Sequence, residues 1–363
     1  MGGVDAASTG ETKPVALQAI AFVAFASGNM GLNLFNSWAL RNHEGVAPSW
    51  DQPSFDFPVF YTMWHMLVSA FAAMLLMCTV ARPATGLPNF TQFWEYKIGL
   101  ISISACTFLN NGLNNMSLTM VSLFTNQVIK ATLPFWLMIF SFVLAKKTYG
   151  PMIIGSVLAL VVGSVLSNAS SFGSSSGQST SLVGVIICVI SLMASAVKPV
   201  VAMMVMAGTP DRPKLAPNLV LFYDTGISFF FMLTYWLCSN EREGSYKYVT
   251  GSSLQSTLTL TIILCGSSMA FIFNIANYYF VMLTSALTSG IAANSIKIVL
   301  IIIAAIQASI ADPLSWTGIA IVILAILGYA YLSIIAKAPP KPPADVEKAT
   351  PILTKTEETP LKQ

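Results

Sequence analysis

The sequence predicts an all-α membrane protein with ten transmembrane helices in two inverted five-helix repeats. Of its 363 residues, 55% are hydrophobic and only 9% are charged, whereas soluble domains contain about 25% charged residues. The apolar residues gather in ten runs, each about as long as the roughly 20 residues that a spanning helix needs. Two of the runs contain matching polar motifs around a lysine. This composition excludes a soluble globule, a disordered chain and a nucleic-acid-binding protein.

Polar or Pro/Gly-rich breaks separate most of the predicted spans. The runs cover about residues 15–40, 58–81, 98–118, 120–145, 149–168, 181–207, 216–238, 256–283, 285–309 and 313–336. The boundary between the third and fourth runs is weak, as is that between the eighth and ninth, because apolar residues are nearly continuous there. We expect the following organisation: a cytosolic N-terminal segment (1–14), the first five-helix repeat (15–168), a Ser-rich luminal loop (169–180), the second repeat (181–336) and a disordered cytosolic tail (337–363).

The basic residues outside the spans lie mostly on one side of the predicted bundle. Ten spans place both termini on the same side, and that side has twelve Lys and Arg residues against three on the other. Without the tail the split is seven to three. The positive-inside rule then places both termini in the cytosol. We expect no secretory or transit peptide, because the first apolar run is too long for a signal sequence and the first arginine is Arg41.

Three lysines and one acid lie within the predicted spans, namely Lys130, Lys198, Lys297 and Asp224. A charged residue in the middle of a bilayer costs about 2.5–3.5 kcal/mol on insertion scales. Snorkelling to the interface is the alternative, and it suits Lys198 better than the other two lysines. An excess of buried positive charge predicts an anionic ligand. Asp224 either balances one of the lysines or carries a proton.

The two lysine motifs predict an internal repeat. Gln127 lies three residues before Lys130, and Asn294 lies three residues before Lys297. Each amide therefore shares a helix face with its lysine. An odd number of spans per repeat inverts the second repeat, which is the layout of many secondary transporters with a site at the bilayer midplane. Chance matching of apolar sequence is the alternative.

The two lysine-centred stretches, residues 115–134 and 284–297, resemble the helix 3–4 and helix 9–10 signatures of the nucleotide-sugar and triose-phosphate transporters. This family belongs to the drug/metabolite transporter superfamily, and the resemblance covers about residues 20–336. It implies ten helices in two inverted repeats and the exchange of phosphorylated solutes. It also implies that Lys130 and Lys297 hold phosphate groups in a central cavity.

Departures from the family pattern argue against its plastid branch. Ile298 follows Lys297 where the plastid phosphate translocators have arginine. Asn126 stands near a position that is typically histidine in that branch, and Ser37 stands where lysine is usual. Lys198 occupies a position where the family often has a basic residue. These departures do not identify the sugar.

Other polar residues are candidates for the cavity wall. Asn29, Asn33 and Asn36 lie on one face of the first span, where they either line the cavity or form hydrogen bonds between helices. Tyr223 either stacks on a base or sugar or packs in the core. The candidate substrate-binding residues are Lys130, Lys297, Lys198, Gln127, Asn294, Asn126, Tyr223 and Asn33, with Asp224 as a charge-balancing residue.

These observations predict a secondary antiporter that moves a nucleotide sugar across a Golgi or endoplasmic reticulum membrane by alternating access, in exchange for a nucleoside monophosphate. One alternative is a sugar-phosphate or organic-phosphate antiporter, with a plastid-type envelope as an alternative location. Others are a receptor or scaffold that does not transport, and a proton-coupled exporter of amines or amino acids, which three buried lysines disfavour because they would repel cations. We expect no enzyme, cofactor or metal site, since no nucleophile–base pair, metal-ligand cluster or phosphate loop is evident. The expected partners are a phosphorylated anionic small molecule, a counter-substrate and the lipid bilayer, with a homodimer left open and no nucleic acid.

Overall fold

The computed structural model describes residues 15–39, 55, 57–118, 120–121, 123–173, 181–208, 212–251, 253–284, 286, 289–290, 292–293, 296 and 312–335. The regular secondary structure of this part of the chain is helical, which confirms the predicted all-α class. Five of its helices are long and apolar enough to cross a membrane, and three shorter apolar helices accompany them. The count of ten spans and the inverted repeat stay predictions.

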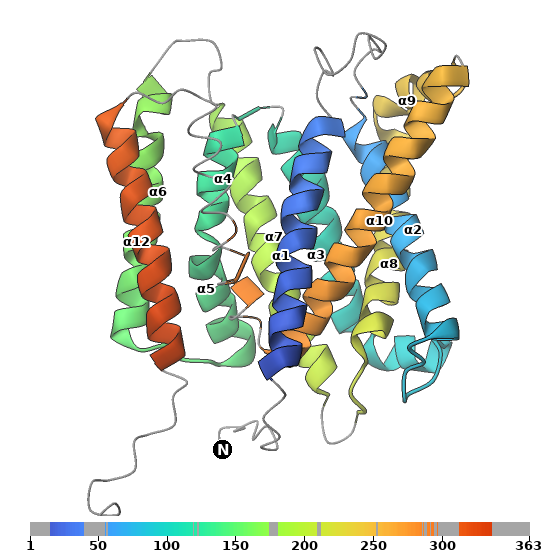
Figure 1. Cartoon of the computed structure of the whole chain (residues 1–363), viewed down its shortest axis with the longest axis horizontal. Helices are drawn as coiled ribbons and strands as arrows, with labels where there is room; N and C mark the ends of the chain where they lie inside the picture. Colours follow the sequence, from blue (N-terminus) through green and yellow to red (C-terminus); the bar gives the residue numbers. More distant parts are fainter. Residues whose placement is uncertain are drawn as a thin grey trace, which may run out of the picture.

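The helices stand side by side along roughly one direction (Figure 1). The first turn of α1 and the last turn of α12 lie at the same end of the bundle, the lower end in the view, and α9 lies at the opposite end. The helices are α1 (Val15–Ala39), α2 (Pro58–Thr79), α3 (Phe90–Leu118), α4 (Leu123–Ala131), α5 (Leu133–Ala145), α6 (Pro151–Gly173), α7 (Leu182–Ala207), α8 (Pro217–Cys238), α9 (Glu241–Val249), α10 (Ser253–Leu283) and α12 (Pro313–Ile335).

Helix α3 begins at Phe90, eight residues before the apolar run that predicts it. Asn89 starts this helix, because its side-chain oxygen accepts a hydrogen bond of 2.9 Å from the backbone N–H of Gln92. A side chain that satisfies an N–H group of the first turn is a common N-cap. The polar first turns of α3 therefore extend beyond the apolar segment, and the run marks only part of the helix.

The predicted fourth span, residues 120–145, is divided into α4 and α5 at Thr132. Pro134 is the second residue of α5 and has no N–H to donate to the carbonyl of Lys130. Thr132 closes α4 instead, because its N–H and its hydroxyl both donate to the carbonyl oxygen of Ile129, at 3.0 and 2.7 Å. The span is therefore not one continuous helix, and Lys130 lies in the last turn of α4.

Helices α6 and α12 form a pair at one edge of the bundle, the left edge in Figure 1. Their backbones approach closely at Gly318, where an added Cβ would lie 2.2 Å from the backbone N of Ser167 and 2.8 Å from the carbonyl oxygen of Gly163. Small residues permit such close helix contacts in lipid. Leu160 and Val322 are buried in the same interface region. Glycine at position 318 is therefore required by the packing of α6 against α12.

The two halves of the chain interlock. The most extensive contacts between the two halves are those of α1 with α10, α2 with α8, α3 with α7, and α6 with α12. The contact of α1 with α10 is close, since a Cβ on Gly28 would lie 3.1 Å from the Cα of Phe273. The ring of Phe25 stacks on the ring of Phe273, with centroids 5.7 Å apart. Residues distant in sequence therefore meet between the helices.

Helix α9 lies in the break between two predicted spans, and the apolar pattern does not indicate it because its residues are mostly polar. Its first residue, Glu241, reaches the first turn of α2. The carboxylate accepts hydrogen bonds from the backbone N–H groups of Val59 and Phe60, at 3.0 and 3.1 Å. The first N–H groups of a helix have no partner within the helix, and the helix dipole favours an anion there. Glu241 therefore fastens α9 to the start of α2.

Candidate functional site

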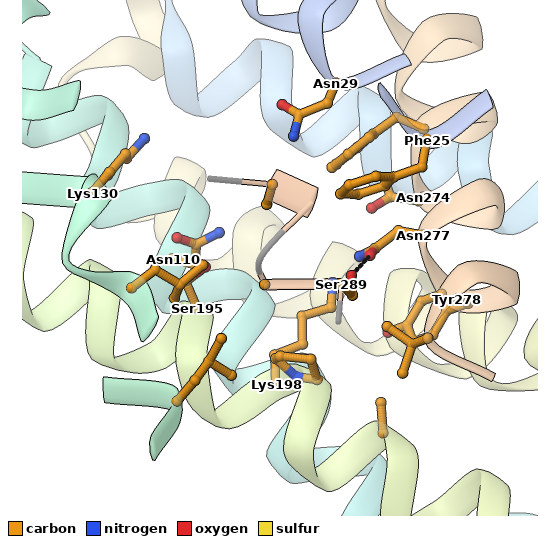
Figure 2. Close-up of a pocket in the computed structure, with 18 of the residues that line it drawn as sticks. Phe25, Asn29, Asn110, Lys130, Ser195, Lys198, Asn274, Asn277, Tyr278 and Ser289 are labelled. Carbon is orange, nitrogen blue, oxygen red and sulfur yellow. Dashed lines mark hydrogen bonds between the residues drawn. The ribbon is translucent and has the colours of Figure 1, made fainter. Parts of the chain in front are cut away.

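A cavity of about 210 Å³ lies between α1, α3, α4, α5, α7 and α10. Figure 2 shows several of the residues that line it. The described part of its wall contains two lysines, six asparagines, two serines and one tyrosine, and no carboxylate. These polar residues are Lys130, Lys198, Asn29, Asn33, Asn110, Asn111, Asn274, Asn277, Ser195, Ser289 and Tyr278. The described wall therefore places two cations and nine neutral polar side chains among apolar residues.

Lys130 reaches the cavity from the last turn of α4. A cation is favoured at this end of a helix, because the carbonyl groups of the last turn carry partial negative charge. The position follows from the break at Thr132, since a continuous helix would leave Lys130 in the helix interior. In Figure 2 its side chain lies across the cavity from Asn29 and Asn277.

Lys198 lines the cavity from α7 and has a buried counter-charge behind it. Its Nζ lies 2.9 Å from Oδ2 of Asp224, and the side chain of Asp224 is only 1% exposed. The hydroxyl of Tyr278 donates a 2.7 Å hydrogen bond to the same oxygen. The hydroxyl of Ser228 lies 3.3 Å from Oδ1 of Asp224. Asp224 is thus held by groups from α7, α8 and α10, which is the environment that a buried carboxylate needs.

The residue after Lys198 shapes the same wall. Pro199 lies inside α7 and cannot donate a hydrogen bond to the carbonyl of Ser195, one turn earlier. Ser195 and Pro199 both line the cavity. A proline in a transmembrane helix is tolerated where other polar groups satisfy the freed carbonyl. The sequence Lys198-Pro199 therefore places a charge and a backbone acceptor at one cavity wall.

The wall carries net positive charge in its described part. Lys198 is balanced by Asp224, and Lys130 adds a second cation to a wall in which no carboxylate is described. Charges interact strongly where water is scarce, since the effective dielectric constant is lower there. An anion in the cavity would therefore be stabilised, and an organic cation would be repelled.

The structure brings three of the predicted site residues to the cavity: Lys130, Lys198 and Asn33. Asn29 also lines it, whereas Asn36 accepts a hydrogen bond of 3.0 Å from the hydroxyl of Tyr61 instead. Sequence reasoning missed Asn110, Asn111 and Asn277 as wall residues. The spacing of Asn274 and Asn277, three residues apart on an apolar helix, is the signal that could have found one of them.

Two predicted site residues lie outside the described wall. Asn126 is buried, and its amide nitrogen is 3.0 Å from Oγ of Ser117 and 3.3 Å from Oδ1 of Asn114. Tyr223 donates a 2.9 Å hydrogen bond to the backbone oxygen of Asn89, near the start of α3. Both side chains connect helices in this structure, and neither is placed where it contacts the contents of the cavity.

The remaining predicted site residues, from the fourth and ninth spans, lie wholly or partly outside the described residues. Gln127 lies in α4, one turn before Lys130, and its side chain lies outside the described residues. Lys297 and Asn294 also lie outside the described residues. The described neighbours Ser289, Gly290 and Ala293 line the cavity. The predicted contribution of the ninth span to the site therefore stays a prediction.

Long apolar helices around a polar cavity that contains two lysines define a multi-pass membrane protein. The chain belongs to the Triose-phosphate Transporter family, which matches residues 18–332. It is therefore a member of a family of transporters and not an enzyme. This result confirms the resemblance that the two lysine-centred stretches indicate.

Relatives from Arabidopsis thaliana align with most of the chain. A probable sugar phosphate/phosphate translocator is 28% identical over 289 residues, which is 79% of this chain and 73% of that protein. UDP-uronic acid transporter 1 is 25% identical and covers 77% of this chain and 84% of its own length. A solved crystal structure also superposes with a TM-score of 0.51 over 89% of this chain and 98% of that chain, at 11% identity. This likeness shows a shared fold.

Proposed function

We propose that this protein is a secondary antiporter that carries a nucleotide sugar across an endomembrane in exchange for a nucleoside monophosphate. The observation that carries the proposal is the cavity, whose described wall contains Lys130 and Lys198 and no carboxylate. Charge-assisted hydrogen bonds from lysine to phosphate oxygens are among the strongest that a protein forms. UDP-uronic acid transporter 1, a relative, is named for such a substrate.

A second candidate is the exchange of a sugar phosphate for phosphate. Three relatives, 24–28% identical to this chain, are named probable sugar phosphate/phosphate translocators. The same lysines would serve either substrate, because both present phosphate oxygens. The two candidates differ in what occupies the rest of the cavity, a nucleoside in one case and only a sugar in the other.

In the proposed mechanism, Lys130, Lys198 and Lys297 bind the phosphate groups, with Lys297 contributed by the predicted ninth span. An empty cavity with several cations resists closure, because closing it removes water from a wall that carries more positive than negative charge. A bound phosphate supplies the counter-charge, so the loaded carrier passes through the occluded state more readily than the empty one. This preference produces exchange rather than net leak, and alternating access then follows the scheme of many secondary transporters.

We place the protein in the Golgi or endoplasmic reticulum membrane with both termini cytosolic. The cytosolic orientation of the termini is supported by the excess of Lys and Arg in the loops on the side of the termini. The first turn of α1 and the last turn of α12 lie at the same end of the bundle, in agreement with this arrangement (Figure 1).

The test is uptake by purified protein in proteoliposomes. Vesicles are loaded with UMP, GMP, CMP or inorganic phosphate, and uptake of labelled nucleotide sugars and sugar phosphates is measured. We expect uptake of a nucleotide sugar that depends on a nucleoside monophosphate inside. Uptake of a sugar phosphate that depends on internal phosphate would select the second candidate. Equal uptake by empty and loaded vesicles would refute antiport.

A further inference from the structure

A second pocket, of about 510 Å³, lies between the ends of α7 and α10, the start of α8 and the segment that precedes α3. Its wall is largely apolar and includes the side chains of Met203, Met206 and Met282. Lys214 is the charged residue in the described part of this wall. The side chains of Ala84 and Lys214 are exposed, so the pocket reaches the surface of the protein.

The pocket lies at the end of the bundle where the chain begins. Helix α8 ends just before α9, and α10 begins just after it. Because α9 lies at the end of the bundle opposite to the first turn of α1 (Figure 1), the start of α8 and the end of α10 lie near that first turn. In the proposed orientation this end faces the cytosol.

The pocket adjoins the central cavity. Val281 of α10 lines both spaces, and on α7 Ala202 lines the cavity while the next residue, Met203, lines the pocket. Val281 is only 3% exposed and Ala202 only 1%. Apolar side chains therefore separate two spaces that follow one another along the same two helices. Such an apolar constriction blocks an ion, because the ion would have to shed its water to pass.

Positive charge surrounds the mouth of the pocket. The two segments that frame it, residues 81–89 and 212–216, contain Arg82, Arg212 and Lys214 and no acidic residue. All three side chains are exposed. Within the described part of the chain, Lys214 forms no ion pair. A mouth with charges of one sign attracts ligands of the opposite sign and raises their rate of encounter.

Hydrogen bonds hold one side of this mouth in place. The hydroxyl of Tyr223 accepts a 3.0 Å bond from the backbone N–H of Asn89 and donates a 2.9 Å bond to the backbone oxygen of the same residue. The side-chain amide of Gln92 donates a 2.6 Å bond to the backbone oxygen of Thr85. The hydroxyl of Thr85, which lines the pocket, has no partner among the described residues. Rotation about its Cα–Cβ bond would make this hydroxyl available to a ligand.

We propose that this pocket is the cytosolic entrance of the transport pathway. Lys214 binds a phosphate group of the incoming substrate there, before the apolar layer at Val281 opens towards the central cavity. The inference rests on the proposed function and adds a second anion site to that of the cavity. A phospholipid headgroup offers the same phosphate chemistry, with acyl chains along the methionines, and the first test distinguishes the two sources.

The first test measures the charge of the pocket without transport. Ala84→Cys introduces a thiol into the exposed part of the wall, and its reaction with anionic sulfonatoethyl and cationic trimethylammonioethyl methanethiosulfonate is followed by peptide mass spectrometry. Each rate is divided by the rate with free cysteine. We expect the ratio of anionic to cationic rates to exceed one and to fall at least about two-fold when Lys214→Ala is added. UDP-glucose and glucose 6-phosphate should slow the reaction, whereas glucose should not.

Lys97→Ala is the matched control for the charge. Lys97 lies in α3 near the same end of the bundle, outside the pocket wall, with its Nζ 3.5 Å from the ring centroid of Trp94. Its replacement removes the same charge and should leave the ratio unchanged. If phosphatidylinositol in nanodiscs slows the reaction and the soluble phosphates do not, the pocket is a lipid site and the proposed entrance is refuted.

The second test measures exchange from each side in vesicles sorted by orientation. Lys214→Ala should raise KM for the cytosolic substrate about two- to five-fold at low ionic strength, with an unchanged maximal rate and an unchanged luminal KM. Lys214→Arg should behave like wild type, and Lys214→Glu should raise KM further. Salt at about 0.5 M should remove these differences, because it screens exposed charges. A purely structural role of Lys214 would not produce this dependence on side and salt.

The third test concerns the apolar layer. Val281→Ala should widen the constriction, so that vesicles loaded with labelled UMP lose it several-fold faster than wild type when no substrate is outside. Val205→Ala is the matched control. Val205 belongs to the same buried cluster and loses the same volume, but it lines neither space. It should not increase the leak.

The outcomes separate the entrance from the proposed function. An active antiporter whose labelling ratio and cytosolic KM do not respond to Lys214→Ala would refute the entrance and leave the antiporter standing. Equal leaks from Val281→Ala and Val205→Ala vesicles would refute the barrier at Val281. Absence of exchange for every phosphorylated compound would refute the proposed function and the entrance with it, even if the labelling shows that the pocket attracts anions.

Discussion

Replacement of Asp224 by asparagine should destabilise the protein by about 3 kcal/mol. Nζ of Lys198 lies 2.9 Å from the carboxylate, and at this distance two unit charges attract by about 6 kcal/mol at an effective dielectric constant of about 20. The cost of removing both groups from water offsets much of this attraction, so that breaking a buried pair typically costs about 3–5 kcal/mol. Asparagine can still accept the hydrogen bond from Tyr278, which places the expected loss at the lower end.

The double variant Lys198→Met/Asp224→Leu separates stability from transport. Replacing both members of a buried pair by apolar residues is often neutral or stabilising, so this protein should be more stable than Asp224→Asn. It should nevertheless transport poorly, because Lys198 lines the proposed phosphate site. Thermal unfolding in detergent and proteoliposome exchange are measured on the same preparations. Thr234→Ala, on the exposed face of α8, is the control and should change stability by less than about 0.5 kcal/mol.

Two results would show that the reasoning is wrong. One is an Asp224→Asn protein as stable as wild type, which would mean that the pair contributes nothing to folding. The other is a double variant no more stable than the single one, which would mean that an unbalanced Lys198 is not the cause of the loss. The pH profile of exchange adds a separate readout: if Asp224 also carries a coupled proton, exchange by Asp224→Asn becomes independent of pH.

Three further predictions follow from other parts of the molecule. Lys130→Ala should lower substrate affinity about ten- to hundred-fold, since it removes a charge-assisted contact of about 1.5–3 kcal/mol; a well-expressed variant with wild-type uptake would overturn the site. Gly318→Ala should destabilise the α6–α12 pair by about 1–3 kcal/mol, measured by thermal unfolding, because its Cβ would meet backbone of α6, whereas Gly328→Ala on the same helix has no atom within 4 Å and should be neutral. Asn168-Ala169-Ser170 and Asn89-Phe90-Thr91 are glycosylation sequons, the first next to the predicted luminal loop and the second in a predicted cytosolic break. In glycosidase assays of cell membranes, Asn168 should therefore be the one that is glycosylated and Asn89 should stay unmodified; a glycan on Asn89 would reverse the proposed orientation.

The sequence predicts the helices well where an apolar run ends at a strong local signal. Residues Pro58 and Pro217 begin α2 and α8, within one residue of the predicted starts, because proline fits the first turn of a helix and not its interior. The apolar pattern does not predict the break at Thr132, because the residues around it remain apolar and a helix can accommodate Pro134 by bending. Helix α9 escapes it because polar residues carry no apolar signal.

The sequence predicts which charged residues belong to the candidate site, but it does not predict which of them pair with each other. A charge inside an apolar run is conspicuous, so the sequence identifies Lys130, Lys198 and Asp224 directly. It does not show that Lys198 and Asp224 face each other, because they lie on different helices and their contact depends on how α7 packs against α8. Asn110 and Asn111 are missed for a similar reason: an asparagine near the end of a span is as well explained by a helix–helix hydrogen bond. The packing of α3 against α7 turns them towards the cavity.

The interlocking of the two halves constrains how such a carrier could move. A motion that swung the first half of the sequence as one block would have to separate α1 from α10, α2 from α8, α3 from α7 and α6 from α12. It would also break the bonds between Glu241 and the start of α2. Rigid bodies that each combine helices from both halves keep these contacts. We therefore expect α2, α8 and α9 to move together as one rigid body. The hinge would then lie at the break between α4 and α5 at Thr132 and at Pro199, where α7 lacks one backbone hydrogen bond. Lys130 and Lys198 lie beside these two positions, so binding of the ligand to the lysines would act directly on the hinge.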